Sequence, residues 1–195
     1  MSITAEAVKK LREATGAGMM DAKKALEETN GDMDAAVEYL RKAGQKIAAK
    51  KADRSTGEGI VGMYVHSNGK IAAMVKVLCE TDFVARTDDF KALANDLAMQ
   101  VAAMNPQYIT SDEVPQDVKD KELSIYKEEM KESGKPEDII QKIAEGKLDK
   151  YYSDVCLMKQ SFIKDDKLTI EKWFTEMIAK LGENIQVTEF HRFSI

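Results

Sequence analysis

The four residues Ser67-Asn68-Gly69-Lys70 join two segments in which hydrophobic residues recur at every second position. An Asn-Gly pair accepts the left-handed dihedral angles of a type I′ turn, which matches the twist of two paired strands. The pattern therefore predicts a β-hairpin that begins near Glu58. Pairing across the turn places six residues on one face, which we expect to pack against helices: Ile60, Gly62, Tyr64, Ala73, Val75 and Val77.

The second strand of this hairpin leads into a corner before the next helix, which is expected over residues 87–104. Two interpretations of Phe83 and Asp82 are open. In the first interpretation, Phe83 is a core residue, because most phenylalanines are interior, and Asp82 is a helix cap. Alternatively, a rigid corner projects both side chains as a wedge into another protein. The corner reads Leu78-Cys79-Glu80-Thr81-Asp82-Phe83-Val84-Ala85-Arg86.

Residues 1–44 have the start and stop signals of three short helices. We expect the first to end at Gly16, the second at Asn30-Gly31 and the third at Gly44. Such a bundle, of the ubiquitin-associated type, is small enough to be only marginally stable, which suits a docking module. Residues 45–56 carry four cations among alanines and are predicted to form a helical linker. These charges either bind RNA or simply face solvent.

The remaining residues, 57–195, are predicted to form a core of the α+β class, in which helices pack on an antiparallel sheet of at least three strands. A surface-exposed helix is expected between Val114 and Gly134. A second helix should run from Pro136 to Glu145 and stop at Gly146, and a third lies within 168–181. The closing segment from Ile185 should add a strand to the hairpin.

Composition narrows the range of functions. The net charge of −5 argues against a nucleic-acid surface, which needs clustered cations. The sequence contains neither an apolar stretch of about 20 residues nor a secretory core, so we expect a cytoplasmic protein without membrane contact. Cys79 and Cys156 form no C-x-x-C pair and are expected to be buried, reduced thiols.

The candidate chemical groups do not form a catalytic pattern. His66 and His191 have neither a neighbouring nucleophile nor the spacing of metal ligands. The glycines at 57, 59 and 62 precede a strand and are not followed by Lys-Ser/Thr, so they do not predict a phosphate cradle. The acidic pairs at 88–89 and 165–166 are interpreted as solvated. We therefore expect a protein that is not an enzyme, with no cofactor, no metal and no direct nucleotide binding.

Three stretches of the chain resemble the elongation factor Ts family of bacterial and organellar translation. They are the run from Val8 to Leu26, which contains Thr15-Gly16-Ala17-Gly18-Met19-Met20-Asp21, the run Cys79-Glu80-Thr81-Asp82-Phe83-Val84-Ala85-Arg86, and the ending from Gly182-Glu183-Asn184-Ile185 to Phe190-His191-Arg192-Phe193. The resemblance spans nearly the whole chain. It implies a guanine-nucleotide exchange factor whose partner is elongation factor Tu.

The resemblance also implies roles for individual residues. The exchange motif is Thr81, Asp82, Phe83 and Val84. In the family, the residues matching Asp82 and Phe83 intrude beside the partner's nucleotide site and disturb the binding of magnesium and phosphate. Arg12, Met19 and Met20 match positions that meet the partner's nucleotide domain.

The length of the chain resembles the short form of the family, with one core subdomain, which is expected to pair into a homodimer. Some short members have a cysteine in the final F-x-R-F motif where this chain has His191, so a disulfide-linked dimer is not expected. Two other functions stay open. The three-helix start alone is compatible with a ubiquitin-type adaptor or scaffold, and the basic linker with an RNA-binding translation protein.

Overall fold

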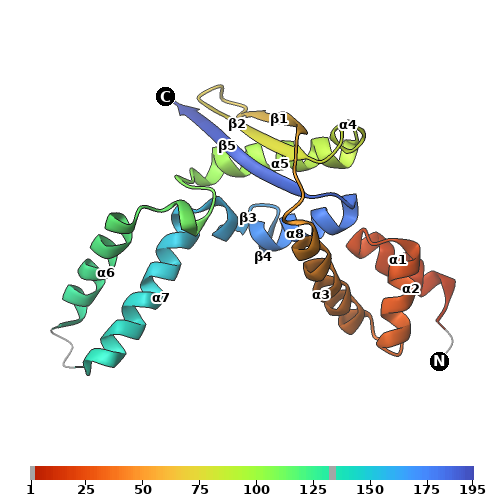
Figure 1. Ribbon diagram of the computed structural model, residues 1–195, viewed down its shortest axis with the longest axis horizontal. Coiled ribbons are helices and arrows are strands. Elements are labelled where there is room, and N and C mark those ends of the chain that lie inside the picture. Colours follow the sequence, from red (N-terminus) through yellow and green to blue (C-terminus); the bar gives the residue numbers. More distant parts are fainter. Residues whose placement is uncertain (1–2, 132–134) are drawn as a thin grey trace. The chain divides into compact units, whose positions relative to one another are not determined.

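The fold is α+β, as the sequence predicts, in a computed structural model that describes residues 3–131 and 135–195 (Figure 1). Three helices come first and a β-hairpin follows; helices α4 to α7 then lead to the short strands β3 and β4, after which come α8 and β5. The elements are α1 (Ala5–Thr15), α2 (Met19–Glu28), α3 (Met33–Lys51), β1 (Glu58–Val65), β2 (Ile71–Cys79), α4 (Asp82–Ala85), α5 (Asp88–Met104), η1 (Ser111–Glu113), α6 (Gln116–Lys131), α7 (Glu137–Val155), η2 (Leu157–Lys159), β3 (Ser161–Phe162), β4 (Asp165–Thr169), α8 (Ile170–Leu181) and β5 (Ile185–Ser194). Within the described residues, none of these helices combines the length and the apolar character needed to cross a membrane.

The chain divides into two compact units. The first consists of Met1–Ile60, Leu78–Leu93 and Trp173–Gln186, and the second of Val61–Val77, Ala94–Lys172 and Val187–Ile195. The first unit thus holds the N-terminal helices, the strand-to-helix corner and most of α8. The second holds most of the hairpin, the later helices and most of β5.

In the first unit, α1 and α2 end where the sequence predicts. The Thr4 hydroxyl accepts a hydrogen bond from Ala7 N at 3.2 Å, and Gly16 ends α1 with a φ of 68°. Asn30 and Gly31, which follow α2, both have a positive φ. Helices α1 to α3 have an apolar core of their own, which consists of Val8, Leu11, Ala22, Ala25, Leu26 and Ala36.

The prediction that Gly44 ends the third helix is wrong. Helix α3 continues to Lys51 and includes much of the segment predicted as a separate linker. A glycine ends a helix when it adopts a positive φ, and Gly44 is not among the described glycines that do so. A Cβ added at Gly44 would lie 3.4 Å from the Ala179 Cβ, so the glycine lets α3 approach α8. Arg41 and Glu176 pair across these two helices at 3.0 Å.

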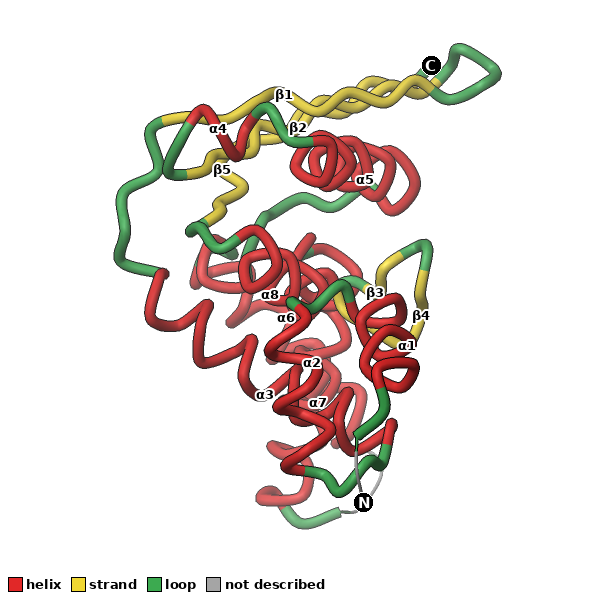
Figure 2. The backbone as a smooth tube through the Cα atoms, turned by 90° about the vertical axis from the view of Figure 1, so that its right-hand side faces the viewer, coloured by secondary structure: helices red, strands yellow, loops and turns green. Residues whose placement is uncertain are grey.

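The two hairpin strands and the closing strand form the predicted three-stranded sheet, in the order β1-β2-β5. Its expected inner face is confirmed on β2, where Ala73, Val75 and Val77 are buried; on β1 Gly62 is buried, while Ile60 and Tyr64 are half-buried. Helix α5 lies on one face of the sheet (Figure 2). A Cβ added at Gly62 would lie only 2.2 Å from the Ala94 carbonyl oxygen, so this approach between β1 and α5 requires glycine.

The turn of the hairpin is not of type I′. Among the described residues other than glycine, only Asn30 and Asn105 have a positive φ, so Asn68 does not. Gly69, with a φ of 67°, donates to the His66 carbonyl at 2.8 Å and closes a four-residue turn. The Asn68 side chain accepts from Lys70 N at 2.9 Å. Asn68 thus contributes to the turn through its side chain. The hydrogen bond of that side chain competes with the left-handed backbone conformation that the sequence pattern predicts.

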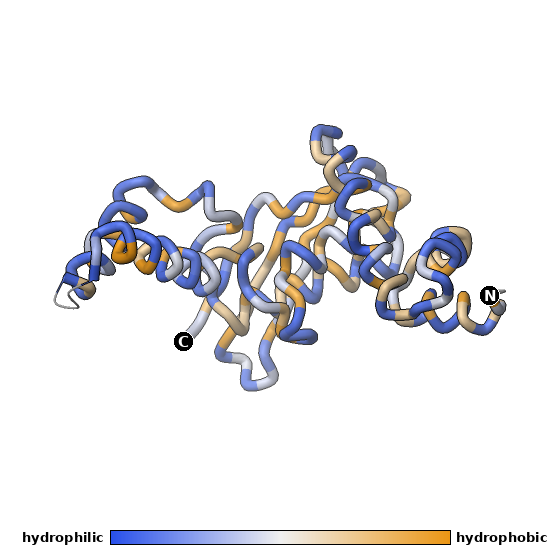
Figure 3. Tube along the Cα trace, turned by 90° about the horizontal axis from the view of Figure 1, so that it is seen from below, coloured by the Kyte–Doolittle hydropathy of each residue, from blue (hydrophilic) through white to orange (hydrophobic). Residues whose placement is uncertain are grey.

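In the second unit, α6 and α7 pack against each other (Figure 1). None of the described residues of α6 is fully buried, as expected for a surface-exposed helix, and hydrophilic residues dominate both helices, at the left of Figure 3. The predicted end of the first helix at Gly134 lies outside the described residues. The prediction that the second helix stops at Gly146 is wrong, because α7 runs to Val155. Lys147 lies over the Tyr126 ring at 5.4 Å, so packing on α6 continues beyond the glycine.

The sequence analysis did not predict the two-stranded sheet of β3 and β4. Two fully buried glutamines support it. Gln100 Nε2 donates to Gln160 Oε1 at 3.2 Å and to the Ser161 carbonyl at 3.0 Å, and Gln100 Oε1 accepts from Ile163 N at 3.0 Å. These contacts join residues about 60 positions apart, which no local pattern could indicate.

Candidate functional site

The corner of residues 79–86, between β2 and α5, places an aromatic side chain in solvent. Strand β2 ends at Cys79, and Thr81 is the N-cap of the one-turn helix α4. Phe83 is 79% exposed, whereas Ala85, two positions later, is buried. So exposed a phenylalanine contributes little to the packing of its own chain. The interpretation of Phe83 as a core residue is therefore wrong.

Asp82 does not cap the helix, contrary to the other half of that interpretation. The cap is Thr81, whose hydroxyl oxygen accepts from Val84 N at 3.5 Å, a long contact. Asp82, the first residue of α4, pairs instead with Arg86 at 2.9 Å. Exposed ion pairs of this helical spacing contribute only about 0.3–0.5 kcal/mol. The Asp82 carboxylate can therefore leave Arg86 for another partner at little cost.

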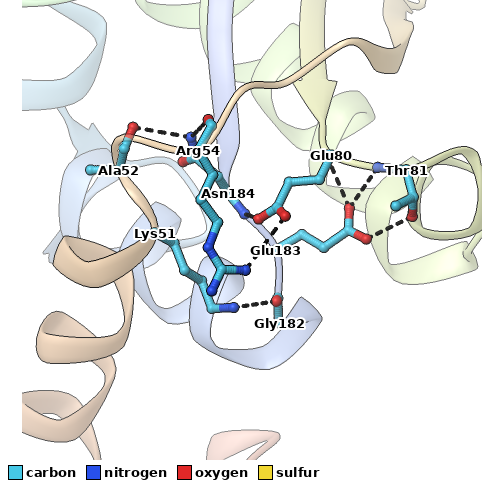
Figure 4. Close-up of polar contacts among 8 residues, drawn as sticks. All are labelled: Lys51, Ala52, Arg54, Glu80, Thr81, Gly182, Glu183 and Asn184. Atoms are coloured by element: carbon cyan, nitrogen blue, oxygen red, sulfur yellow. Dashed lines mark hydrogen bonds and ion pairs between the residues drawn. The ribbon is translucent and has the colours of Figure 1, made fainter.

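One carboxylate from a distant part of the chain holds the backbone of the corner. Glu183 Oε2 accepts from the backbone N–H groups of Glu80 and Thr81, both at 3.0 Å. Its other oxygen, Oε1, accepts from the Thr81 hydroxyl at 2.6 Å. These three contacts fix the residues directly before Asp82 and Phe83 (Figure 4).

A second set of contacts ties the loop of residues 182–184, which carries Glu183, to the end of α3. The Asn184 side chain donates to the carbonyl groups of Ala52, at 3.2 Å, and Arg54, at 2.7 Å. Its backbone N–H donates to Glu80 Oε1 at 2.6 Å. Arg54 reaches the other Glu80 oxygen at 3.5 Å, and Lys51 donates to the Gly182 carbonyl. We call residues 182–184, with these partners, the junction (Figure 4).

The junction changes the ionisation of Glu80. The hydrogen bond from Asn184 N lowers the pKa of this carboxyl most; burial opposes it, and the charge and hydrogen bond of Arg54 and the charge of Lys51 lower the pKa further. The charged form of Glu80 is thus the form that the fold prefers. The network in Figure 4 is therefore held by two carboxylates, those of Glu80 and Glu183.

The two cysteines are free and buried, as predicted. Cys79 lies at the corner itself and donates from Sγ to the Thr81 carbonyl at 3.2 Å. Burial, and then the charge of Glu183, raise the pKa of the Cys79 thiol. The thiol is therefore neutral at physiological pH, where it packs and donates but does not act as a nucleophile.

The predicted residues of the N-terminal helices lie around one pocket of about 680 Å³. Arg12 comes from α1, while Met19 and Met20 begin α2. The two methionines are 62% and 76% exposed, although they are apolar. The other lining residues are Ile3, Ala5, Val8, Lys9, Glu13 and Lys23. An apolar floor with a rim of mainly positive charges suits a partner surface that is apolar at its centre and acidic at its edge.

The structure thus gathers the seven predicted site residues at two places in the first unit: Thr81, Asp82, Phe83 and Val84 at the corner, and Arg12, Met19 and Met20 at the pocket. The analysis from the residues alone missed Glu183 and Asn184. Their one local signal is Gly182, which ends α8 with a φ of 75° and is followed by two polar residues before a strand. Over the part of the chain that is described, no group of three or more His, Cys, Asp or Glu side chains is arranged to hold a metal ion.

Comparison with known proteins gives a consistent result. A sequence model of the family described as "Elongation factor TS" matches residues 2–195. Elongation factor Ts of Fervidobacterium nodosum is 56% identical over 195 residues, which cover 100% of this chain and 99% of the relative. The protein of the same name from Thermosipho melanesiensis is 54% identical, over 99% of this chain and 98% of the relative. That of Geobacter sulfurreducens is 52% identical, over 99% and 89%.

Proposed function

Because this chain belongs to the elongation factor Ts family, we propose that it is the guanine-nucleotide exchange factor for elongation factor Tu. As a member of that family it is a translation elongation factor, and we propose that it acts in the cytoplasm. One observation carries the proposal for the mechanism: Phe83, at the centre of the corner, is 79% exposed beside the carboxylate of Asp82. In this mechanism both side chains enter the partner near its magnesium and phosphate site. No covalent bond is made or broken, so the factor is not an enzyme.

The exchange follows from linkage between two ligands of one protein. A factor that binds the nucleotide-free partner more tightly than the GDP complex weakens GDP binding by the same factor. Magnesium bridges phosphate oxygens and is itself held by few protein ligands. A carboxylate and an apolar ring pushed beside it disturb this coordination, and the bound diphosphate then loses a main support.

The energies require more than the corner. Burying one phenylalanine contributes about 1.5–3 kcal/mol, whereas moving an equilibrium from 1:99 to 99:1 needs about 5.5 kcal/mol. The pocket around Arg12, Met19 and Met20 is a second surface in the first unit that suits a partner. We therefore propose that the pocket provides affinity for the partner's nucleotide domain and that the corner provides displacement.

The test is the release of a fluorescent GDP from elongation factor Tu, measured over a range of factor concentrations. The wild-type chain should accelerate release, and Phe83→Ala should lower the maximal rate about ten- to one-hundred-fold. Met104→Ala is a matched control, because it removes an exposed apolar side chain of α5 that the mechanism does not use. No acceleration by the wild type would refute the function, and equal maximal rates for wild type and Phe83→Ala would refute the wedge.

We further propose that two copies of the chain pair through the sheet. The face of the sheet opposite α5 exposes apolar side chains on all three strands: Val61, Met63 and Val65 on β1, Met74 on β2 and Phe193 on β5. Phe193 belongs to this face because its neighbour Arg192 donates to the Ala102 carbonyl of α5 at 3.0 Å. An apolar face on one side of a sheet is typical of an interaction surface. A second copy fits it by two-fold symmetry.

Light scattering tests the pairing. The wild type should have twice the 21.8 kDa mass of the chain, and Met63→Glu should have the mass of one chain. Met104→Glu places the same charge at an exposed methionine of α5, away from this face, and should stay paired. A monomeric wild type, or a paired Met63→Glu, would contradict the proposal.

The division of the chain into a module at 1–44, a linker at 45–56 and a core at 57–195 stays a prediction about where docking, exchange and pairing are located.

A further inference from the structure

The helix that carries Phe83 is too short to hold itself in place. Helix α4 has four residues, and isolated helices of fewer than about 12 residues are not stable in water. Its internal support is a few backbone contacts, such as Ala85 N to the Thr81 carbonyl at 3.2 Å. Phe83 itself is 79% exposed, so its own packing does little to anchor the helix. The orientation of the ring therefore depends on what fixes the residues on either side of it: the buried Ala85 after it, and the partners of Glu80 and Thr81 before it.

Glu183 fixes those residues with both of its oxygens. Its Oε2 satisfies two successive backbone donors, those of Glu80 and Thr81, at 3.0 Å each. These N–H groups lie between the end of β2 and the start of α4, where neither element offers them a partner. Hydrogen bonds to a carboxylate are stronger than those to neutral acceptors.

The third contact controls the cap. The Thr81 hydroxyl has a single proton and gives it to Glu183 Oε1 at 2.6 Å. The lone pairs of the hydroxyl oxygen are then left to face Val84 N, which lies 3.5 Å away. Without Glu183 the Thr81 hydroxyl is free to rotate. Its proton can then point toward Val84 N, the amide from which the hydroxyl oxygen must accept a hydrogen bond. The carboxylate thus sets the orientation of the N-cap of α4.

We propose that Glu183 is a positioning residue for nucleotide exchange, acting through Thr81 to hold the corner so that Phe83 enters the partner in one orientation. This inference rests on the proposed function. Glu183 need not touch the partner: its effect is to remove the cost of ordering the corner at the moment of entry. It should therefore influence the rate of release at saturation more than the concentration of factor that saturates.

The experiment compares Glu183→Gln and Glu183→Ala with wild type in the GDP-release assay, over a range of factor concentrations. Gln keeps one acceptor oxygen and Ala keeps none, so the maximal rate should fall about three-fold and about ten-fold or more, respectively. The half-saturating concentration should change less than three-fold. The matched control is Glu176→Gln, which breaks the pair with Arg41 between α3 and α8, away from the corner, and should leave the maximal rate unchanged.

A second readout separates positioning from general stability. Amide hydrogen exchange at Glu80 and Thr81 should accelerate in Glu183→Ala, because both N–H groups lose their acceptor, while protection in the core of α1 to α3 stays the same. A double-mutant cycle with Thr81→Val, which removes the hydroxyl, should give a combined loss smaller than the product of the two single losses.

The outcomes distinguish the two proposals. If the wild type accelerates release and Glu183→Ala reaches the same maximal rate, the positioning role is overturned and the exchange function stands. A fully multiplicative double-mutant cycle likewise overturns the role of Thr81 as intermediary. If the wild type does not accelerate release, both proposals fail. Should Glu183→Ala not fold, Glu183→Gln, alone and in a double-mutant cycle with Thr81→Val, decides the question.

Discussion

The corner and the pocket both present apolar side chains to solvent, but the chain holds them in different ways. The pocket rests on an apolar core made of residues from α1, α2 and α3, all within 28 positions of one another. The corner has polar support instead, from Glu183 and Asn184, about 100 positions away in sequence. Apolar packing tolerates small shifts, whereas hydrogen bonds fix distances and angles. The difference suits the roles proposed for the two regions, affinity for the pocket and displacement in one geometry for the corner.

The largest expected effect separates the stabilities of the two regions. Leu26 is fully buried in the core of the N-terminal helices, and Leu26→Ala should cost about 2–5 kcal/mol, a large share of what so small a module can have. Amide hydrogen exchange should accelerate in α1 and α2 far more than at Glu80 and Thr81. Leu157→Ala is the matched control, because this leucine is equally buried but lies in the second unit. Equal acceleration at the corner would show that both regions unfold together.

The next effect separates affinity from displacement. Replacing Met19 and Met20 together by alanine removes the most exposed apolar atoms of the pocket. About 1 kcal/mol of lost burial for each side chain should raise the half-saturating concentration roughly ten- to thirty-fold. The maximal rate of GDP release should stay near that of wild type, which is the reverse of the result expected for Phe83→Ala. Met104→Ala, at another exposed methionine, should change neither quantity. A fall in the maximal rate alone would end the distinction between the two surfaces.

The smallest effect concerns pH and the polar support of the corner. Since the junction lowers the pKa of Glu80 in the folded state, its carboxylate stabilises the fold fully above the ordinary pKa. This contribution is lost as the pH falls through the lowered value, in a window below about pH 4.3. Exchange protection at the corner should therefore decrease over that window, and less steeply in Glu80→Gln.

Glu38 provides the control for the pH experiment. The hydrogen bond and charge of Lys42 also lower its pKa, but on an exposed face of α3. Glu38→Gln should leave the pH profile of the corner unchanged. A profile for Glu80→Gln identical to that of wild type would assign the acid sensitivity to other groups.

Local signals in the sequence predicted most of the fold. The alternation around Asn68-Gly69 gave the hairpin, and Gly16 and Gly182, both with positive φ, end helices as expected. Glycine was also predicted to end a helix at Gly44 and Gly146, but there the helix continues. At Gly44 a contact with Ala179, 135 positions away, explains the glycine. At Gly146 no atom lies within 4 Å of an added Cβ, and nothing in the structure explains the choice of glycine.

The sequence alone predicted less of the candidate site than of the fold. Residue type alone favoured a buried Phe83, because the average phenylalanine is buried and the corner gives no local sign of exposure. The resemblance to a family reversed that expectation, and the 79% exposure agrees with it. Glu183 escaped the analysis for a different reason. Its role depends on pairing with two backbone amides, and a sequence records no backbone partners.

The junction also sets an order of events during synthesis. Thr81 and its carboxylate partner Glu183 are separated by 102 positions. At roughly 5–20 residues per second, a ribosome makes the second about 5–20 seconds after the first. The N-terminal helices can fold within that interval, because their core is local, while the corner still lacks its acceptor. Until residue 183 is made, the growing chain therefore has the helices of the pocket but not the carboxylate that holds the corner.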